Sequence, residues 1–301
     1  MIFLTKQQKA KQSDDLLAFT RKESQWKDIF ARLIRNRLGI VGLVIVAMLV
    51  ILVLFAPLFT KYNYSAQDFG SRFVYPNAQH IMGTDEFGRD LWARLLYGGR
   101  ISLLVAVLAV CIGSSIGAFL GAVAGYFGGI IDSVITRSLD VVMAIPSLLL
   151  AIAVSAALGS GPVNTALAIS IGGIPGGARL IRSSIMSIRE NEFVEAARIS
   201  GSSDLRIIFV HILPNTIAPL IVSATLGIGG NIMAISSLSF IGLGVQPPIP
   251  EWGSILSTGR AYIRDFWPLV TFPSLFIALT LFGFNLFGDA LRDSLDPRLK
   301  D

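Results

Sequence analysis

The segment 190–213 holds the residues that are best placed to act on a partner molecule. It is polar and helix-prone, yet it stands between two uncharged segments that are each long enough to cross a membrane. Glutamates near its start favour a helix N-terminus, paired alanines permit close approach by another surface, and a glycine breaks the helix before a second one begins. We therefore expect two short water-exposed helices that are driven by a soluble partner chain. The residues expected to take part in this coupling are Glu192, Glu195, Ala196, Ala197, Arg198, Gly201, Leu213 and Pro214.

Residues that could perform catalysis are sparse. His80 and His211 are the two histidines, and neither belongs to a recognisable nucleophile arrangement or shares a helix face with a second metal ligand. The single cysteine, Cys111, lies within an apolar run and offers no disulfide or metal spacing. The chain has no GxxxxGK[ST] loop to hold ATP phosphates. The sequence therefore predicts a chain without catalytic residues, cofactor or metal, and ATP hydrolysis is expected in a separate chain.

The composition predicts a membrane protein. Of 301 residues, 53% are hydrophobic and 15% are charged. A helix needs about 20 residues to cross the hydrocarbon core, so the longest uncharged runs must be divided at their glycine and proline clusters. We predict an all-α protein with six transmembrane helices, at 38–60, 101–131, 141–158, 163–180, 215–240 and 266–288.

The distribution of lysine and arginine predicts the orientation of the chain. Eighteen of the 25 basic residues fall on the side that holds both termini and the segment 179–214. Cytoplasmic loops carry an excess of these residues, so both termini and the coupling segment are expected in the cytoplasm. The predicted divisions are a cytoplasmic amphipathic tail (1–37), a peripheral span (38–60), an external loop (61–100), a five-helix core (101–290) with the coupling helices at 190–213, and a cytoplasmic tail (291–301).

The segment 83–90 has two interpretations. Its alternating carboxylates and glycines resemble part of a calcium loop, but the full twelve-residue spacing and the terminal glutamate are missing. The favoured interpretation is a turn whose carboxylates pair with Arg89 and Arg94. Asp140 and Asp289, at the borders of spans, are interpreted as interfacial groups and not as the proton relays of a secondary transporter.

A set of motifs in one order resembles the permease subunit of binding-protein-dependent ABC importers. The coupling segment matches the family's cytoplasmic signature in spacing, although His211 stands where the general pattern has isoleucine; in the dipeptide, oligopeptide and nickel branch a polar residue there is acceptable. Further matching motifs cover 83–297: Gly83-Thr84-Asp85, Gly88-Arg89-Asp90, Gly125-Tyr126-Phe127-Gly128-Gly129, Ile145-Pro146-Ser147, Phe240-Ile241-Gly242-Leu243-Gly244, Pro250-Glu251-Trp252-Gly253, Asn285-Leu286-Phe287-Gly288-Asp289 and Leu295-Asp296-Pro297.

The resemblance implies a type I importer permease fold in the bacterial plasma membrane. It also implies a second, homologous permease subunit, two ATPase subunits that bind ATP and Mg, and an extracellular or periplasmic solute-binding protein. The implied function is to form the translocation pathway for di- or oligopeptides, with glutathione or chelated nickel as alternative cargo. The residues expected to contact the external binding protein are Asp85, Arg89, Glu251 and Trp252.

The pathway itself is expected in the span 215–240, where hydroxyl and amide side chains lie among glycines. Such groups can replace water around peptide-like cargo, or they can form hydrogen bonds between packed helices, and both alternatives stay open. The candidates are Ser223, Thr225, Asn231, Ser236 and Ser237. The main rival function, a stand-alone ion-coupled transporter, is disfavoured because charged residues are absent from the middle of the predicted spans.

Overall fold

The computed structural model describes residues 32–295 as a bundle of helices joined by short connections. The expected tail 1–37 therefore lies almost entirely outside the described residues, as do 296–301 of the C-terminal tail. The long helices are α3 (Arg37–Leu54), α5 (Leu91–Phe127), α8 (Pro162–Ile188), α12 (Ala218–Phe240) and α14 (Pro268–Leu295). The shorter ones are α4 (Ala56–Phe59), α6 (Gly129–Met143), α7 (Ser147–Leu158), α9 (Glu192–Ile199), α10 (Asp204–Arg206), the π-helix η2 (Ile207–Ile212), α11 (Leu213–Thr216) and α13 (Trp252–Gly259), with 3₁₀ turns at Phe69–Ser71 and Arg260–Tyr262.

Within residues 32–295, four helices are long and apolar enough to cross a membrane: α3, α5, α12 and α14. They correspond to the spans expected at 38–60, 101–131, 215–240 and 266–288. The pair α6 and α7 would add a fifth span, although it is bent by 86° at the break. Helix α8, which replaces the span expected at 163–180, is long enough but less apolar. The structure thus shows an all-helical membrane protein with four or five candidate spans.

Several helix boundaries differ from the expectation: α3 ends earlier, at Leu54, whereas α8 and α14 extend further, to Ile188 and Leu295. Two further differences have an identifiable cause. Helix α5 begins at Leu91, inside the expected external loop 61–100, because Asp90 caps its first turn by accepting a hydrogen bond from Ala93 N at 2.7 Å. The span expected at 141–158 is interrupted before Pro146: its residues 141–143 form the end of α6, and the rest forms the separate helix α7.

Helix α6 is attached to α8 by two ion pairs. Asp132 binds Arg182 at 2.5 Å and Asp140 binds Arg179 at 2.5 Å. Asp140 therefore has an arginine partner, in agreement with a structural role for this carboxylate. The predicted spans were chosen as runs without charged residues, so most of α6 was not included in them. The two ion pairs explain how α6 can nevertheless carry Asp132 and Asp140.

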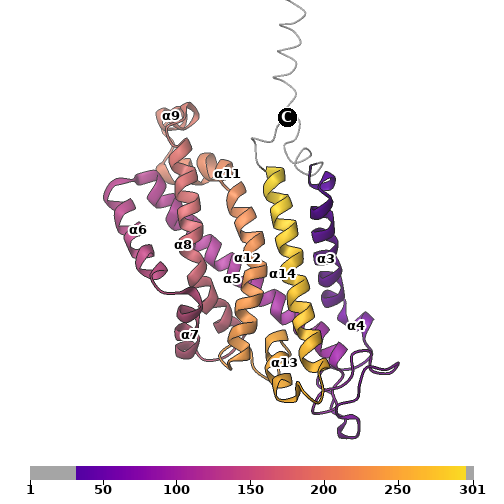
Figure 1. Cartoon of the computed structure of the whole chain (residues 1–301). Coiled ribbons are helices and arrows are strands. Elements are labelled where there is room, and N and C mark those ends of the chain that lie inside the picture. The colour runs from indigo at the N-terminus through magenta and orange to yellow at the C-terminus, as the bar shows by residue number, and fades with distance from the viewer. Residues whose placement is uncertain (1–31, 296–301) are drawn as a thin grey trace, which may run out of the picture.

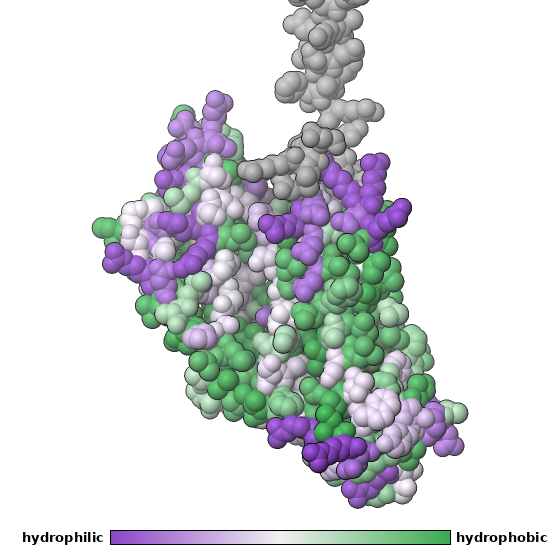
Figure 2. Space-filling model, viewed as in Figure 1, coloured by the Kyte–Doolittle hydropathy of each residue, from purple (hydrophilic) through white to green (hydrophobic). Residues whose placement is uncertain are grey.

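The helices run roughly side by side, and the two ends of the described chain lie together (Figure 1). The start of α3 and the end of α14 are at the end of the bundle that also carries α9, whereas α13 and the residues around α4 are at the opposite end. On the face shown in Figure 2, hydrophobic residues cover the middle and hydrophilic ones gather at both ends. This banded surface is the pattern expected of a chain whose middle faces lipid.

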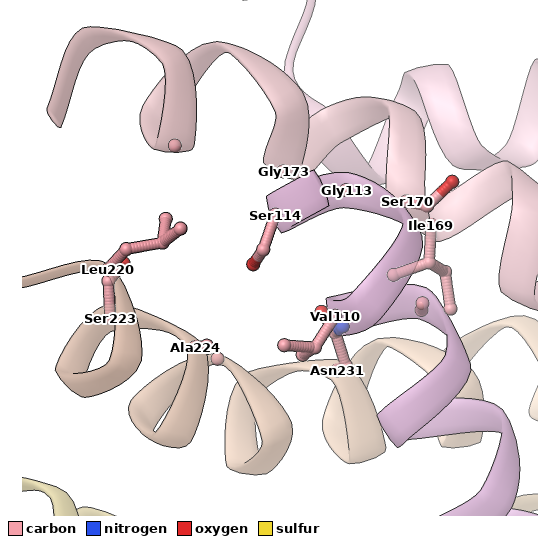
Figure 3. Close-up of a pocket in the computed structure, with 13 residues that line it drawn as sticks. Val110, Gly113, Ser114, Ile169, Ser170, Gly173, Leu220, Ser223, Ala224 and Asn231 are labelled. Carbon is pink, nitrogen blue, oxygen red and sulfur yellow. The ribbon is translucent and has the colours of Figure 1, made fainter. Parts of the chain in front are cut away.

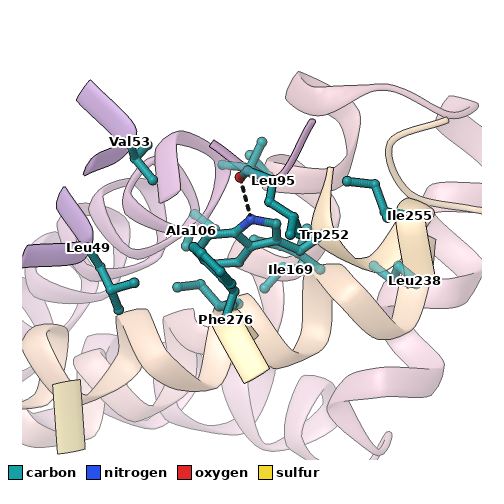
Figure 4. Packing of buried hydrophobic residues seen from close by; sticks show 14 of the residues in the cluster. Leu49, Val53, Leu95, Ala106, Ile169, Leu238, Trp252, Ile255 and Phe276 are labelled. Carbon is teal, nitrogen blue, oxygen red and sulfur yellow. Dashed lines mark hydrogen bonds between the residues drawn. The ribbon is translucent and has the colours of Figure 1, made fainter. Parts of the chain in front are cut away.

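The main core lies near the α13 end of the bundle. Trp252 is fully buried there, its Nε1 donates a hydrogen bond to the carbonyl oxygen of Leu95 at 2.8 Å, and its ring packs against Phe276 (Figure 4). A buried indole whose N–H is satisfied contributes apolar contact without an unpaired donor. Trp252 thereby joins α13 to α5 and α14.

A stripe of glycines packs α5 directly against α8. Gly113, Gly117, Gly121 and Gly125 recur at every fourth position, and a Cβ added at any of them would collide with backbone atoms of α8. Small residues at this spacing let two helix backbones approach closely inside a membrane. The backbones of α5 and α8 are therefore in direct contact along this stripe.

Candidate coupling site and cavity

The candidate coupling segment, 190–213, folds as short helices on either side of a turn. Helix α9 starts at Glu192, and Gly201 follows it with φ at +76°, a conformation that favours glycine. Ser203 precedes α10 and makes no side-chain cap hydrogen bond to it. Instead, η2 and α11 continue the helical path from α10, so that Leu213 and Pro214 open α11.

The inner face of this segment rests on an apolar cluster at the ends of α5 and α8. Val194 and Ala197 of α9 are buried with Ile207, Ile208 and Ile212 of η2. Ile181 and Ile185 of α8 and Ala122 of α5 belong to the same cluster. A buried aliphatic side chain contributes roughly 1.5–3 kcal/mol, so the segment is held firmly against the bundle.

The outer face of the segment is exposed. Of the expected coupling residues, Glu192, Glu195, Ala196 and Arg198 are exposed, and Ala197 is buried in the apolar cluster. Two apolar side chains extend beside them, because Ile199 is 87% and Leu205 is 61% exposed. Carboxylates around unpartnered aliphatic groups at the tip of a bundle are typical of a docking surface.

A cavity of about 120 Å³ lies between α5, α8 and α12. Ser223 and Asn231 of α12, two of the pathway candidates, line it, and Ser114 of α5 points from the opposite side into the gap (Figure 3). Gly173 and Ser170 contribute the α8 wall. The lining is uncharged and small, which suits a compartment for a neutral polar molecule.

The other three pathway candidates lie outside the lining of this cavity. Thr225 donates its hydroxyl to the carbonyl oxygen of Ile221 at 2.9 Å, and Ser237 donates to Met233 at 2.8 Å. Ser236 is buried against Gly253 of α13. Sequence reasoning missed the lining residues on α5 and α8, although the glycine repeat on α5 was a signal that a neighbour lies close.

All four residues expected to contact an external protein are buried. Asp85 is 1%, Arg89 is 7%, and both Glu251 and Trp252 are 0% exposed. Asp85 binds Arg89 at 2.6 Å and Arg94 at 3.3 Å, and Arg89 also binds Glu86 at 3.1 Å. This confirms the turn with paired carboxylates. These four side chains lie in the interior of the chain, so they are not accessible for direct contact with an external protein.

Burial and hydrogen bonding shift the pKa of several groups outside the spans. Burial raises the pKa of Glu86 and of Glu251, and for Glu251 the hydrogen bonds from Gly253, Ser239, Ser254 and Ser102 oppose this rise. Hydrogen bonds from Ser71 and Gly70 lower the pKa of Asp68. Within residues 32–295, His, Cys, Asp and Glu form no group of three that could hold a metal ion.

Comparison with protein families identifies the class of protein. Residues 117–301 match the family described as binding-protein-dependent transport system inner membrane component, and residues 24–78 match the N-terminal TM domain of oligopeptide transport permease C. The first match covers more than half of the chain, so the chain belongs to the family of inner membrane components of binding-protein-dependent transport systems. It is a multi-pass, non-catalytic permease subunit of a bacterial ABC importer, and the resemblance seen in its motifs is confirmed.

Individual relatives match over nearly their full length. The dipeptide transport system permease protein DppC of Alkalihalophilus pseudofirmus is 46% identical, with 92% of this chain and 91% of the relative covered. The di/tripeptide transport system permease protein DppC of Pseudomonas aeruginosa is 40% identical, with 92% and 94% covered. The glutathione transport system permease protein GsiD of Salmonella typhimurium is 46% identical, with 91% of each covered.

A solved structure supports the fold. The inward-facing MetNI methionine ABC transporter contains a chain that matches with a TM-score of 0.53 at 16% identity, covering 67% of this chain and 96% of that chain. At this identity the likeness concerns the fold alone, and it agrees with the ABC importer permease fold expected from the motifs.

Proposed function

We propose that this chain forms part of the translocation pathway of an ATP-driven importer for short peptides. The relatives named for dipeptides, di/tripeptides and glutathione all carry small peptides, and they match this chain at 40–46% identity. The uncharged cavity between α5, α8 and α12 supports such cargo, because hydroxyl, amide and backbone groups can bind peptide amides without fixing a charge.

We further propose six crossings in a type I arrangement, with both termini and α9 in the cytoplasm. The path of the chain supports this count, since α3, α5, the pair α6–α7, α8, α12 and α14 run alternately up and down the bundle (Figure 1). The short length of α7 is compensated by α6, which is neutralised by its ion pairs to α8. The excess of lysine and arginine at the α9 side supports the orientation.

The coupling of this chain to ATP is assigned to the segment α9–α11. The observation that carries the assignment is the pair of exposed apolar side chains, Ile199 and Leu205, on a segment whose other face is anchored in the ends of α5 and α8. An ATPase subunit that binds this surface can push or pull on both helices at once. The coupling residues Glu192, Glu195 and Arg198 would form the polar rim of the contact.

The full assembly would contain a second, homologous permease subunit, two ATPase subunits that bind ATP and Mg, and an external solute-binding protein. Closure of the ATPases around ATP would turn the bundle outward, and hydrolysis would reset it by rigid-body motion. Because Asp85, Arg89, Glu251 and Trp252 are buried, we assign them to shaping the external end. The exposed side chains of Phe69, Tyr75 and Ile81 are better placed for external contact.

Uptake by the reconstituted importer tests the coupling assignment. Gly201→Pro is incompatible with the positive φ at this position, so it should abolish ATP-dependent uptake while the subunit still inserts. Ser203→Pro is a matched control, because Ser203 already has φ at −67°, and it should transport normally. Normal uptake with Gly201→Pro, or uptake by this chain alone under an ion gradient, would overturn the proposal.

A further inference from the structure

Tyr126, in the last turn of α5, contacts the coupling segment through both its ring and its hydroxyl. The side chain is 9% exposed, and its ring belongs to the apolar cluster beneath α9. The hydroxyl donates a hydrogen bond to Oδ1 of Asp204 on α10 at 2.6 Å. Arg198 on α9 donates to the same hydroxyl oxygen at 3.5 Å, and its guanidinium lies 5.9 Å from the ring centroid.

These contacts add a directional bond between the coupling segment and α5. The segment is joined covalently to α8 through residues 189–191 and to α12 through η2 and α11. Neither covalent link leads to α5, which the segment otherwise meets through the apolar cluster. The bond from Tyr126 to Asp204 lies beyond the turn at Gly201 and joins α10 to α5.

The helices α5 and α8, which would receive a motion of the coupling segment, line the cavity together with α12. The glycine stripe holds α5 and α8 in direct contact, and this pair supplies Gly113, Ser114 and Ser170 to the cavity wall. The apolar cluster alone would tolerate sliding, since aliphatic contacts have little directionality. The hydroxyl of Tyr126 adds a directional, charge-assisted bond at the place where sliding would otherwise occur.

We propose that Tyr126 is a positioning residue that locks α10 to α5 through Asp204, so that movement of the coupling segment is converted into movement of the α5–α8 pair. This inference rests on the proposed function of the segment α9–α11. It assigns the transmission of force to one hydroxyl and one carboxylate. The docking of the ATPase, in contrast, uses the outer face of α9 and does not depend on this bond.

The test uses the assembled importer in lipid vesicles with its binding protein. Tyr126→Phe keeps the ring and removes the hydroxyl, Asp204→Ala removes the acceptor carboxylate at an exposed position, and the double variant combines them. Each should reduce the peptide transported per ATP hydrolysed by roughly tenfold, the loss expected for one hydrogen bond to a charged group. The KM for peptide should stay within about twofold, and the amount of ATPase bound should not change.

The double variant separates a shared bond from two independent effects. If Tyr126 and Asp204 act through one bond, the double variant should lose no more than either single variant. Tyr97→Phe is the matched control, since Tyr97 lies near the opposite end of α5 against Tyr64 and Arg100, and it should transport normally. Wild-type efficiency in Tyr126→Phe, or losses that add in the double variant, would overturn the inference. Failure of the proposed function would differ, because the wild-type assembly would then show no ATP-driven uptake.

Discussion

The packing of α5 against α8 leads to a sharp prediction for Gly121→Ala. A Cβ at Gly121 would lie 2.9 Å from the carbonyl carbon of Ala178 and closer still to its oxygen, whereas real Cβ contacts essentially never fall below 3.0 Å. The obstacle is backbone, so no side chain can rotate away and the helices must separate. Overpacking of this kind costs about 1–3 kcal/mol, and because a backbone is displaced we expect the upper part of that range.

The assay is thermal unfolding of the purified permease in lipid nanodiscs, followed by tryptophan fluorescence. At roughly 2–4 °C per kcal/mol, Gly121→Ala should lower the apparent Tm by about 5 °C or more. Gly176→Ala is the matched control on α8, because a Cβ there meets nothing within 4 Å. It should leave the Tm unchanged or raise it, since alanine favours a helix more than glycine does. Equal Tm values for the two variants would refute the close backbone packing.

Three further predictions follow from buried or open positions. Asp85→Asn leaves Arg89 and Arg94 buried beside a neutral amide, so it should destabilise the external end by about 3–5 kcal/mol and lower the yield of folded protein; a normal Tm would contradict this role. Burial raises the pKa of Glu251, so the native state keeps a proton that the unfolded state loses. The contribution of Glu251 to stability should therefore be greatest below the ordinary pKa of 4.5 and should be lost as the pH rises through the higher native pKa. Glu251→Gln should flatten this part of a profile of Tm against pH. Gly173→Leu places a side chain in open space at the cavity wall and should block uptake while the protein remains folded; unimpaired uptake would show that peptide passes elsewhere.

The sequence predicts a span well where the limits of an uncharged run coincide with the part of a helix that crosses the membrane. The predicted start of α5 is wrong because Arg94 and Arg100, which were counted as residues of an external loop, have partners inside the fold. Arg94 binds Asp85, and Arg100 donates hydrogen bonds to the carbonyl oxygens of Val53 and Leu54 at the end of α3, both at 2.8 Å. The prediction fails at α6 for the same reason, since arginines from α8 neutralise its carboxylates. Pairing between distant segments cannot be read from a count of uncharged residues.

The candidate residues show a similar division. The coupling segment is local, so its turn at Gly201 and its amphipathic α9 follow from the sequence. Which hydroxyls face the cavity depends on the neighbours of α12; Ser223 does, whereas Thr225 bonds to its own helix. The motif around Trp252 suggested a surface contact, yet tertiary packing buries it completely. Recurring motifs identify the family but do not reveal whether their residues are exposed.

Site-directed cross-linking can show whether α9 carries the proposed contact with the ATPase on the cytoplasmic side. A single cysteine would be introduced as Ile199→Cys after the exposed native thiol is removed by Cys111→Ser. Ile81→Cys, at the opposite end of the bundle and 61% exposed, provides the reference for the external side. We expect the cysteine at position 199 to cross-link to an ATPase subunit and to resist a membrane-impermeant thiol reagent in intact cells, whereas the one at position 81 should be labelled. Labelling of position 199 from outside, or its failure to cross-link to any ATPase in the assembled importer, would show that α9 does not carry this contact.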